Sequence, residues 1–331
     1  MKLSLWITAC AALAAVAPSA HALDYRFTTI NPNVPFVQLT PFGINEAGQV
    51  SGVYTDAVHA DHGFILSGGS FTSFDDPLAD GSRAFAVAGT DGTGNNNTGQ
   101  VVGGYTRTGV LHGFVRDASG VFTSIDMPGH LHTGITDIND TGQMAGVFND
   151  SGNVATFQSF LRSSAGVFTT INVPGSTATS VAGLNNRGTV VGVYDMLGGG
   201  NPFHGFIRSS GGVFQTLDIA GADETDPSGI NDAGWIVGSF TNAIGTHAFV
   251  RDAGGGITEF DVPGAVFTFA TDLDSRGDIV GQYCDAQNLC HGFLAVPVPE
   301  PATLALLALG LGAIALRRSA LRARPKPDGS V

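Results

Sequence analysis

Asp137 and Asp272 are the two residues of this sequence whose type and position best suit catalysis. Each stands where the matching positions of an internal repeat carry Gly43, Gly183 and Gly229. Two carboxyl groups about 5 to 9 Å apart are the groups that hydrolyse glycosidic bonds. We expect these two to face the centre of the fold, and glycoside chemistry stays open as one interpretation.

Other catalytic motifs are missing from the sequence. It contains no Gly-x-Ser-x-Gly motif, no cysteine and histidine spaced as nucleophile and base, and no glycine-rich phosphate loop before a helix. A non-catalytic role is therefore the favoured interpretation. Asp137 and Asp272 are the only specific candidates for a catalytic site.

Five histidines recur at one place of the repeat and raise the question of a metal site. Zinc needs several imidazole nitrogens within about 2.1 Å of one ion. Equivalent positions on units that lie around a wide ring do not converge in this way. We predict instead that each histidine begins a strand and bonds locally, for example to Asp126 or Asp218. The five are His62, His112, His204, His247 and His291.

Asx-x-x-Gly elements such as Asn139–Gly142 and Asn231–Gly234 offer oxygen atoms to a cation. Calcium takes about six to eight oxygen ligands, whereas each element supplies only one or two carboxylates. As tight turns the elements need no metal, because the Asx side chain caps the turn and glycine adopts a positive φ. We predict turns, with calcium as a weaker alternative and no other cofactor.

Cys284 and Cys290 are the two cysteines outside the N-terminal segment. In an oxidising compartment a small-loop disulfide is the expected state. A metal pair is the weaker reading, because no further cysteine completes a thiolate site.

These residues belong to a repeat whose successive spacings are 51, 43, 46, 46 and 43 residues. Each unit has an Asx turn, a β-branched segment, a His-Gly-Phe segment or its variant, and a fourth segment that usually ends in Pro-Gly. Four short strands in about 40 to 50 residues are typical of a β-propeller blade. Glycine recurs in every segment, which disfavours helices. The turns are Asn45–Gly48, Asn96–Gly99, Asn139–Gly142, Asn185–Gly188, Asn231–Gly234 and Asp274–Gly277.

The two ends of the repeat region supply complementary parts of one unit. The sixth unit lacks its fourth strand, whereas a fourth-strand sequence stands alone at Phe27–Asn31 and is identical to Phe168–Asn172. Pairing the two ends would leave no free sheet edge. We therefore predict an all-β, six-bladed β-propeller over residues 23–297, closed by this N-terminal strand.

Three segments depart from the repeat and suit ligand binding, because function tends to lie on loops over a rigid scaffold. They are Thr90–Asn97, read as an insertion, the glycine-rich Leu197–Asn201 and the acidic Asp223–Asp226. Neutral variation in length explains them equally well.

The charge of residues 23–297 restricts the partners. This region has 26 acidic residues, nine arginines and no lysine, which excludes nucleic acid as a partner, because binding it depends on cationic groups that neutralise phosphates. The charge suits a soluble extracellular surface and permits cationic partners.

The N-terminus predicts export. Lys2 precedes the apolar segment Leu3–Val16, and Ala20-His21-Ala22 forms a small-x-small cleavage site. We predict a signal peptide over residues 1–22.

Residues 298–331 form a three-part tail. Val298-Pro299-Glu300-Pro301 is followed by fifteen apolar or small residues and then by Arg317 and Arg318. As a helix the apolar run would be about 22 Å long, short of the roughly 30 Å hydrocarbon core. The tail resembles the PEP-CTERM sorting signal of Gram-negative bacteria.

That resemblance implies a hydrophobic sorting helix, processing by an exosortase, transient anchoring in the inner membrane and release to the cell surface or medium. A permanent single-pass transmembrane anchor stays open. The repeats resemble HAF-type extracellular repeats, which imply location and fold but no assigned activity.

Sorting signals of this kind imply exopolysaccharide production. We therefore expect a non-catalytic binding or scaffold module of the extracellular polysaccharide matrix. The alternatives are a carbohydrate-active lyase or hydrolase on the same fold, and a structural or adhesive protein with protein partners.

Overall fold

The computed structural model describes residues 24–32, 34–81, 90–151, 156–196 and 203–298. These residues form 24 β-strands, and no α-helix occurs among them. The expected signal peptide, the segment 197–201 and the sorting tail from Pro299 onward, including Glu300, Pro301, Arg317 and Arg318, lie outside the described residues. Within the described part of the chain, no helix has the length and apolar character needed to span a membrane.

The strands are β1 (Tyr25–Ile30), β2 (Gln38–Ile44), β3 (Val50–Thr55), β4 (Asp61–Ser67), β5 (Ser70–Phe74), β6 (Thr90–Asn95), β7 (Val101–Arg107), β8 (Val110–Arg116), β9 (Phe122–Ile125), β10 (His132–Ile138), β11 (Met144–Asn149), β12 (Gln158–Arg162), β13 (Phe168–Thr170), β14 (Ala178–Leu184), β15 (Val190–Asp195), β16 (His204–Arg208), β17 (Phe214–Leu217), β18 (Glu224–Ile230), β19 (Ile236–Asn242), β20 (Gly245–Arg251), β21 (Ile257–Phe260), β22 (Phe267–Leu273), β23 (Ile279–Cys284) and β24 (Cys290–Pro297).

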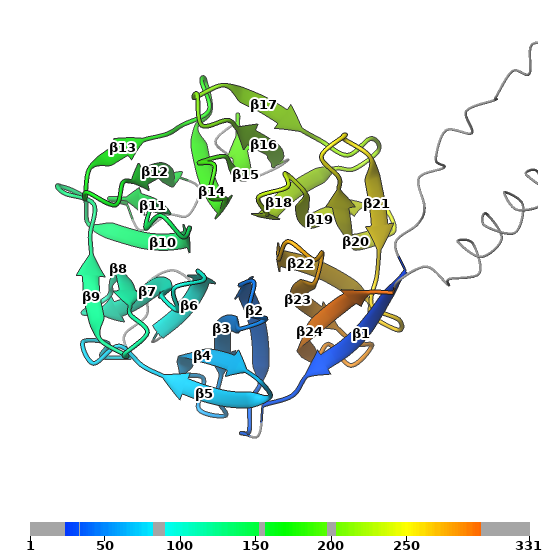
Figure 1. The fold of residues 1–331 in the computed structure, drawn as a ribbon, viewed down its shortest axis with the longest axis horizontal. Helices are drawn as coiled ribbons and strands as arrows, with labels where there is room; N and C mark the ends of the chain where they lie inside the picture. Colours follow the sequence, from blue (N-terminus) through cyan, green and yellow to red (C-terminus); the bar gives the residue numbers. More distant parts are fainter. Residues whose placement is uncertain (1–23, 33, 82–89, 152–155, 197–202, 299–331) are drawn as a thin grey trace, which may run out of the picture.

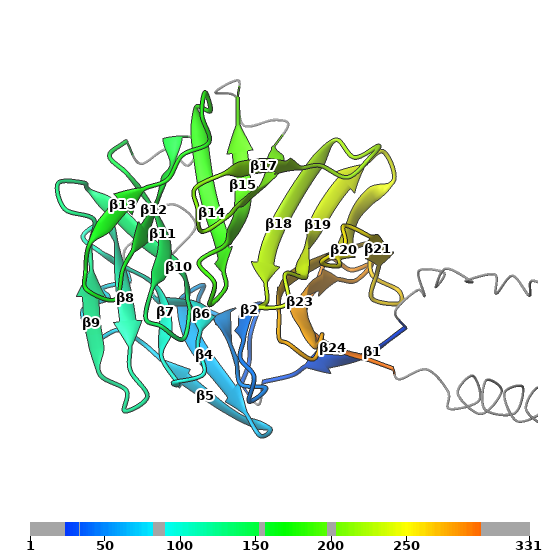
Figure 2. The ribbon, with the colours of Figure 1, turned by 45° about the horizontal axis from the view of Figure 1, so that its top comes forward.

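The strands form a propeller-like ring of antiparallel sheets (Figure 1). Four sheets contain four consecutive strands each, beginning with β6, β10, β14 and β18. Strands β2, β6, β10, β14, β18 and β22 lie innermost around a common centre (Figure 1). Figure 2, a tilted view, shows these sheets standing side by side around the centre.

The remaining eight strands form one sheet. Seven of them follow the order β22-β23-β24-β2-β3-β4-β5, and β1 branches from β24. Strand β1 pairs antiparallel with β24, from Tyr25 opposite Pro297 to Ile30 opposite Gly292. The contact between β24 and β2 is a single parallel pair, Gln38 with Cys290. By its strand pairing the sheet therefore divides into two four-stranded groups that share a single backbone pair.

A β-bulge recurs in every innermost strand. In β10, for example, the register shifts between Ile135 and Asp137, so that Thr136 is the extra residue. A bulge bends the strand and redirects the side chains next to it. The residues that follow the shift in the six strands are Gly43, Gly94, Asp137, Gly183, Gly229 and Asp272.

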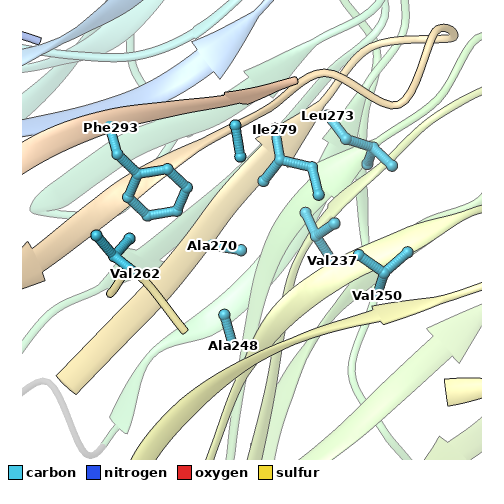
Figure 3. Packing of buried hydrophobic residues seen from close by; sticks show 9 residues of the cluster. Val237, Ala248, Val250, Val262, Ala270, Leu273, Ile279 and Phe293 are labelled. Atoms are coloured by element: carbon cyan, nitrogen blue, oxygen red, sulfur yellow. The ribbon is translucent and has the colours of Figure 1, made fainter. Parts of the chain in front are cut away.

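The core between the sheets is built on the phenylalanine of the His-Gly-Phe segment. Phe64 is fully buried and pairs across the strands with Gly52, where an added Cβ would lie 2.6 Å from the Phe64 ring. The glycine makes room for the ring in this unit, and Gly146 and Gly281 do the same for Phe160 and Phe293. Figure 3 shows one such core, where Phe293 and Ile279 from one sheet meet Val237 and neighbouring residues of the next.

Candidate functional site

A central cavity of about 510 Å³ lies on the axis of the ring, toward the end at which the inner strands begin. Its walls come from all six inner strands, β6 contributing only Thr93, and from Val193 of β15 and Gln282 of β23. The lining side chains that the site depends on are Gln38, Thr40, Phe42, Thr136, Asp137, Ser180, Asp226, Ser228, Phe269, Asp272 and Gln282.

Asp137 and Asp272, the two aspartates singled out from the sequence, both line this cavity. The Asp137 carboxylate accepts the N–H groups of Leu184 at 2.7 Å and Ile138 at 2.8 Å, and the Asp272 carboxylate accepts that of Ile44 at 2.9 Å. Leu184 and Ile44 belong to the next unit along the ring. Each aspartate therefore links its own unit to the neighbouring one.

The electrostatic setting of both aspartates disfavours their charged forms. Burial raises the pKa of Asp137 to about 7, even though its backbone hydrogen bonds oppose the rise. Burial and the nearby charge of Asp137 together raise the pKa of Asp272 well above its usual value. Loss of hydration is thus the main cause of both shifts, and for Asp272 repulsion by the Asp137 carboxylate adds to it.

Asp226 is a third acid in the cavity, placed there by β18. It keeps contact with solvent, but the surrounding protein displaces much of its hydration and, with the charge of Glu224, raises its pKa to about 6. The sequence marked Asp223–Asp226 as a variable acidic segment. Reading it as a loop was wrong, because Glu224 already begins β18.

The segment Thr90–Asn97 is likewise not an insertion. Its residues Thr90–Asn95 form the inner strand β6, with the same bulge as the other units. This strand is rich in glycine and asparagine, which are typical of loops. The sequence therefore did not indicate a strand here. Gly94 is needed there, because an added Cβ would lie 2.7 Å from the Asp137 carboxylate.

Besides the three acids, the cavity is lined by hydroxyl and amide side chains, by two phenylalanine rings, and by the aliphatic residues Val181, Ala182, Val193 and Ala270. Phe42 and Phe269 are partly exposed in it, and Gln282 donates a hydrogen bond to the Thr40 hydroxyl at 2.6 Å. None of the residues that line the cavity is basic. Such a surface suits a ligand with many hydroxyl groups or a positive charge, and it disfavours an anion.

A second, smaller cavity of about 70 Å³ lies toward the other end of the axis, at the Asx turns. In the turn at Asn45, the side-chain oxygen accepts the N–H groups of Ala47 and Gln49, as the turn prediction requires. The side-chain amide also donates to the Asn96 carbonyl of the next unit, at 3.0 Å. This second role links neighbouring units.

The same amide link recurs around the ring. It joins Asn96 to Asn139, Asn139 to Asn185, Asn185 to Asn231 and Asn231 to Asp274, over 3.0–3.1 Å. Asp274, the sixth member, has no amide to donate onward. At that junction Ser275 and Arg276 bind Glu46 instead.

The recurring histidines bond locally, as predicted. His112 lies 3.1 Å from Asp126 and His204 lies 2.9 Å from Asp218. His62 and His247 pair in the same way with Asp75 and Asp261, 13 and 14 residues later in the chain. His291 instead uses its Nε2 atom and bonds to Asp285, six residues earlier. Within the described residues, no group of three or more His, Cys, Asp or Glu side chains is arranged to hold a metal ion.

Cys284 and Cys290 form a disulfide at the turn between β23 and β24. Val298, the first residue of the expected sorting motif, donates its N–H to the Asp24 carbonyl at 2.8 Å. The chain therefore leaves the ring beside its own first strand.

Comparison with known proteins identifies the tail. Residues 297–319 match the model of the PEP-CTERM protein-sorting motif. The motif indicates an exported protein that is sorted to the cell surface, and proteins with it are generally processed by an exosortase. No curated protein matches the chain in sequence.

Several solved structures are similar to the ring. A TolB-like protein from Agrobacterium tumefaciens has a TM-score of 0.54 and 11% identity, with 81% of this chain and 92% of that chain covered. A mutant of AofleA from Arthrobotrys oligospora has a TM-score of 0.52 and 12% identity, with 83% and 90% covered. A gluconolactonase from Xanthomonas campestris has a TM-score of 0.50 and 15% identity, with 83% and 92% covered. At these identities the likeness shows a propeller-like fold alone.

Proposed function

We propose that this exported protein is a non-catalytic binding module whose central cavity holds a saccharide unit of the extracellular polysaccharide matrix. The observation that carries the proposal is the cavity lining, in which carboxylate, amide and hydroxyl groups surround the partly exposed rings of Phe42 and Phe269. Sugars present hydroxyl groups at their edges and apolar C–H faces, which such a lining complements.

The proposal includes a ring of six four-stranded blades. In it, β22, β23, β24 and β1 form the last blade and β2 to β5 the first. The one-pair contact between β24 and β2 supports this division, and the pairing of β1 with β24 supports closure of the ring by the N-terminal strand.

The exit of the chain keeps the cavity free during sorting. Pro297, at the end of β24, lies against Gly277 in the Asp274–Gly277 turn, on the side of the smaller cavity. A tail that leaves from this side would tether the opposite face, with its central cavity, away from the membrane. We infer transient anchoring in the inner membrane, exosortase processing and release.

Binding is favoured over cleavage because Asp137 and Asp272 are engaged in structural hydrogen bonds. Each accepts a backbone N–H from the neighbouring unit, through Leu184 or Ile44. A carbohydrate-active lyase or hydrolase is the second candidate, and the observation in its favour is that both carboxylates line one cavity.

The test is sedimentation of the purified full chain with the exopolysaccharide of its own producer. We expect binding that Asp226→Asn or Phe269→Ala weakens by at least about tenfold, roughly 1.4 kcal/mol. Val213→Ala is the control, since Val213 is 70% exposed in a turn between outer strands. Polymer recovered after incubation should keep its length.

Two other outcomes of this experiment would contradict the proposal. Shortened polymer would replace the binding role by the carbohydrate-active enzyme. Absence of binding would contradict the proposal and favour a structural or adhesive role with a protein partner.

A further inference from the structure

Both ends of the described chain leave the ring at one corner. Tyr25 begins β1 opposite Pro297, the last residue of β24, and the Val298 N–H donates to the Asp24 carbonyl at 2.8 Å. In the sequence, four residues separate β24 from the apolar run 302–316. Four residues extend at most about 14 Å. Any surface that the apolar run enters therefore lies close to this corner.

We call this place the exit corner. It comprises the paired ends of β1 and β24 and the adjacent strands β19 and β21 of the preceding unit (Figure 1). The two units share one core, onto which Tyr25, Phe27, Trp235 and Phe260 pack while they stay partly exposed. The corner is therefore aromatic at its surface.

Trp235 departs from the repeat at its position. It follows the Asx turn of its unit, and the turn uses only its backbone, because the Trp235 N–H donates to the Asn231 side chain at 3.0 Å. Formation of the turn therefore does not require a tryptophan. The matching residues of the other units are all polar: Gln49, Gln100, Gln143, Thr189 and Asp278.

Phe260, in the fourth strand of the same unit, departs from the repeat by its exposure. Its ring lies 5.2 Å from that of Tyr25 and 6.2 Å from that of Phe27. Two departures thus meet where the chain leaves the ring. The residues that match Phe260 are buried, whereas Phe260 is partly exposed; they are Ile30, Phe74, Ile125, Ile171 and Leu217.

Charge distinguishes the two ends of the ring. Of the eight arginines that the structure describes, seven end a third strand, lie in an Asx turn or begin β1, all at the end with the Asx turns. Only Arg107 lies at the opposite end, where an aspartate follows several fourth strands: Asp75, Asp126, Asp218 and Asp261. An anionic surface therefore repels the opposite end more strongly.

Arg26 and Arg276 are the exposed arginines of the exit corner. Arg276 pairs with Asp274 and Asp278, whereas Arg26 makes no ion pair with the described residues. Asp24 and Glu259 are exposed nearby, so the corner is mixed in charge. Arg26 is the group there that can bind an outside anion.

We propose that the exit corner rests on the surface of the lipid bilayer into which the tail inserts, with Trp235 and Phe260 at headgroup level and Arg26 on anionic headgroups. Aromatic rings and arginines with long apolar stems suit the interface between membrane and water, and anionic lipids attract nearby arginines. Lipid is favoured over a second copy of the chain, because the apolar run itself brings the bilayer to this corner.

The inference rests on the transient anchoring proposed above, and it is independent of whether the central cavity holds a sugar. In the docked chain the central cavity opens at the end away from the bilayer. The anchored protein would therefore already present its cavity to extracellular polymer.

The test is tryptophan fluorescence of the mature chain, residues 23–331, reconstituted in vesicles of phosphatidylethanolamine and phosphatidylglycerol. Trp235 is its single tryptophan, since Trp6 lies in the predicted signal peptide. A lipid with a spin-labelled headgroup quenches tryptophans close to headgroup level. We expect this lipid to quench Trp235 at least about twofold more than a tryptophan at the opposite end of the ring.

The comparison chain carries Trp235→Gln and Ile244→Trp. Glutamine stands at three of the matching positions, so the turn should still form. Ile244 is 83% exposed in the turn between β19 and β20, at the opposite end.

Arg26→Glu separates adhesion from mere closeness through the short connection. It should lower the quenching of Trp235 at least about twofold, because a reversed charge is repelled by anionic lipid. The matched control is Arg107→Glu, the same change at an exposed site of the opposite end, which should leave the quenching unchanged.

The outcomes separate docking from anchoring. A chain that does not float with the vesicles would overturn the anchoring and the docking with it. A chain that floats but shows equal quenching at positions 235 and 244, or no loss in Arg26→Glu, would overturn the docking alone. The corner would then be better suited to a protein partner.

Discussion

At the scale of single residues, the histidine–aspartate pair recurs around the ring. His62 lies 2.8 Å from Asp75 and 3.5 Å from Asp56, and its ring stacks on Tyr54 at 5.0 Å between centroids. Burial alone would lower the pKa of His62, but the hydrogen bonds and charges of the two aspartates outweigh it and raise the pKa. Folding therefore favours the imidazolium form of His62 relative to the unfolded chain.

This pair predicts a stability contribution that depends on pH. Because the folded pKa of His62 is raised, its contribution is fully present below the unfolded pKa of about 6.5. It is lost as pH rises through the raised folded value. Asp75→Asn should therefore lower the free energy of unfolding at pH 5.5, by less than about 1 kcal/mol because the pair is partly exposed, and have little effect at pH 8.5. Urea unfolding at both pH values measures this, and an equal loss at both would mean that the pair acts through packing alone.

At the scale of elements, the Asx turn joins neighbouring units as well as its own two strands. Asn185 is 5% exposed. Its oxygen accepts the N–H groups of Arg187 and Thr189, and its amide donates to the Asn231 carbonyl. One side chain thus completes a turn and fixes the distance between two inner strands.

Asn185→Ala should lower the free energy of unfolding by about 2 to 3 kcal/mol, because it leaves buried amide and carbonyl groups unpaired. Asn242→Ala is the matched control. Asn242 is partly exposed and accepts one turn N–H, from Ile244, so its loss should be about 0.5 to 1 kcal/mol. Equal losses in urea unfolding would contradict a linking role for the Asn185 amide.

At the scale of the whole molecule, the sheet between the two ends of the chain is held by β1. Ile30 is 6% exposed, and the Phe27 ring lies 5.9 Å from that of Phe293 and 6.2 Å from that of Phe260. The first strand of the described chain therefore packs onto residues more than 200 positions later. If β1 closes the ring, as we propose, the stability of every unit depends on this strand.

Ile30→Ala should accordingly cost about 2 to 4 kcal/mol, as expected for a large buried side chain. Deletion of residues 24–31 should cause aggregation, because it exposes the edge of β24. Thr28→Ala, at an exposed position of the same strand, is the control. Urea unfolding and light scattering are the measurements, and a soluble deletion variant with normal stability would contradict closure by β1.

The sequence by itself determined what depends on local spacing. The period of the repeat and the all-β class follow from patterns within single units. The Asx turns, the His112–Asp126 type of pair and the Cys284–Cys290 disulfide join residues that are close along the chain. Export was readable for the same reason, since sorting signals are contiguous. Asp137 and Asp272 could be noticed because each breaks a glycine position.

Only the tertiary structure decided how the units meet. The links from Asn45 to Asn96 and from Asp272 to Ile44 join residues 51 and 228 positions apart. The sequence also did not predict that Asp226 lines the central cavity or that Thr90–Asn95 form a strand. The inner strands carry a β-bulge, which could not be predicted from a residue pattern. The physical reason is that register and closure are set by packing between units, where the burial of one side chain depends on a partner far away in the chain.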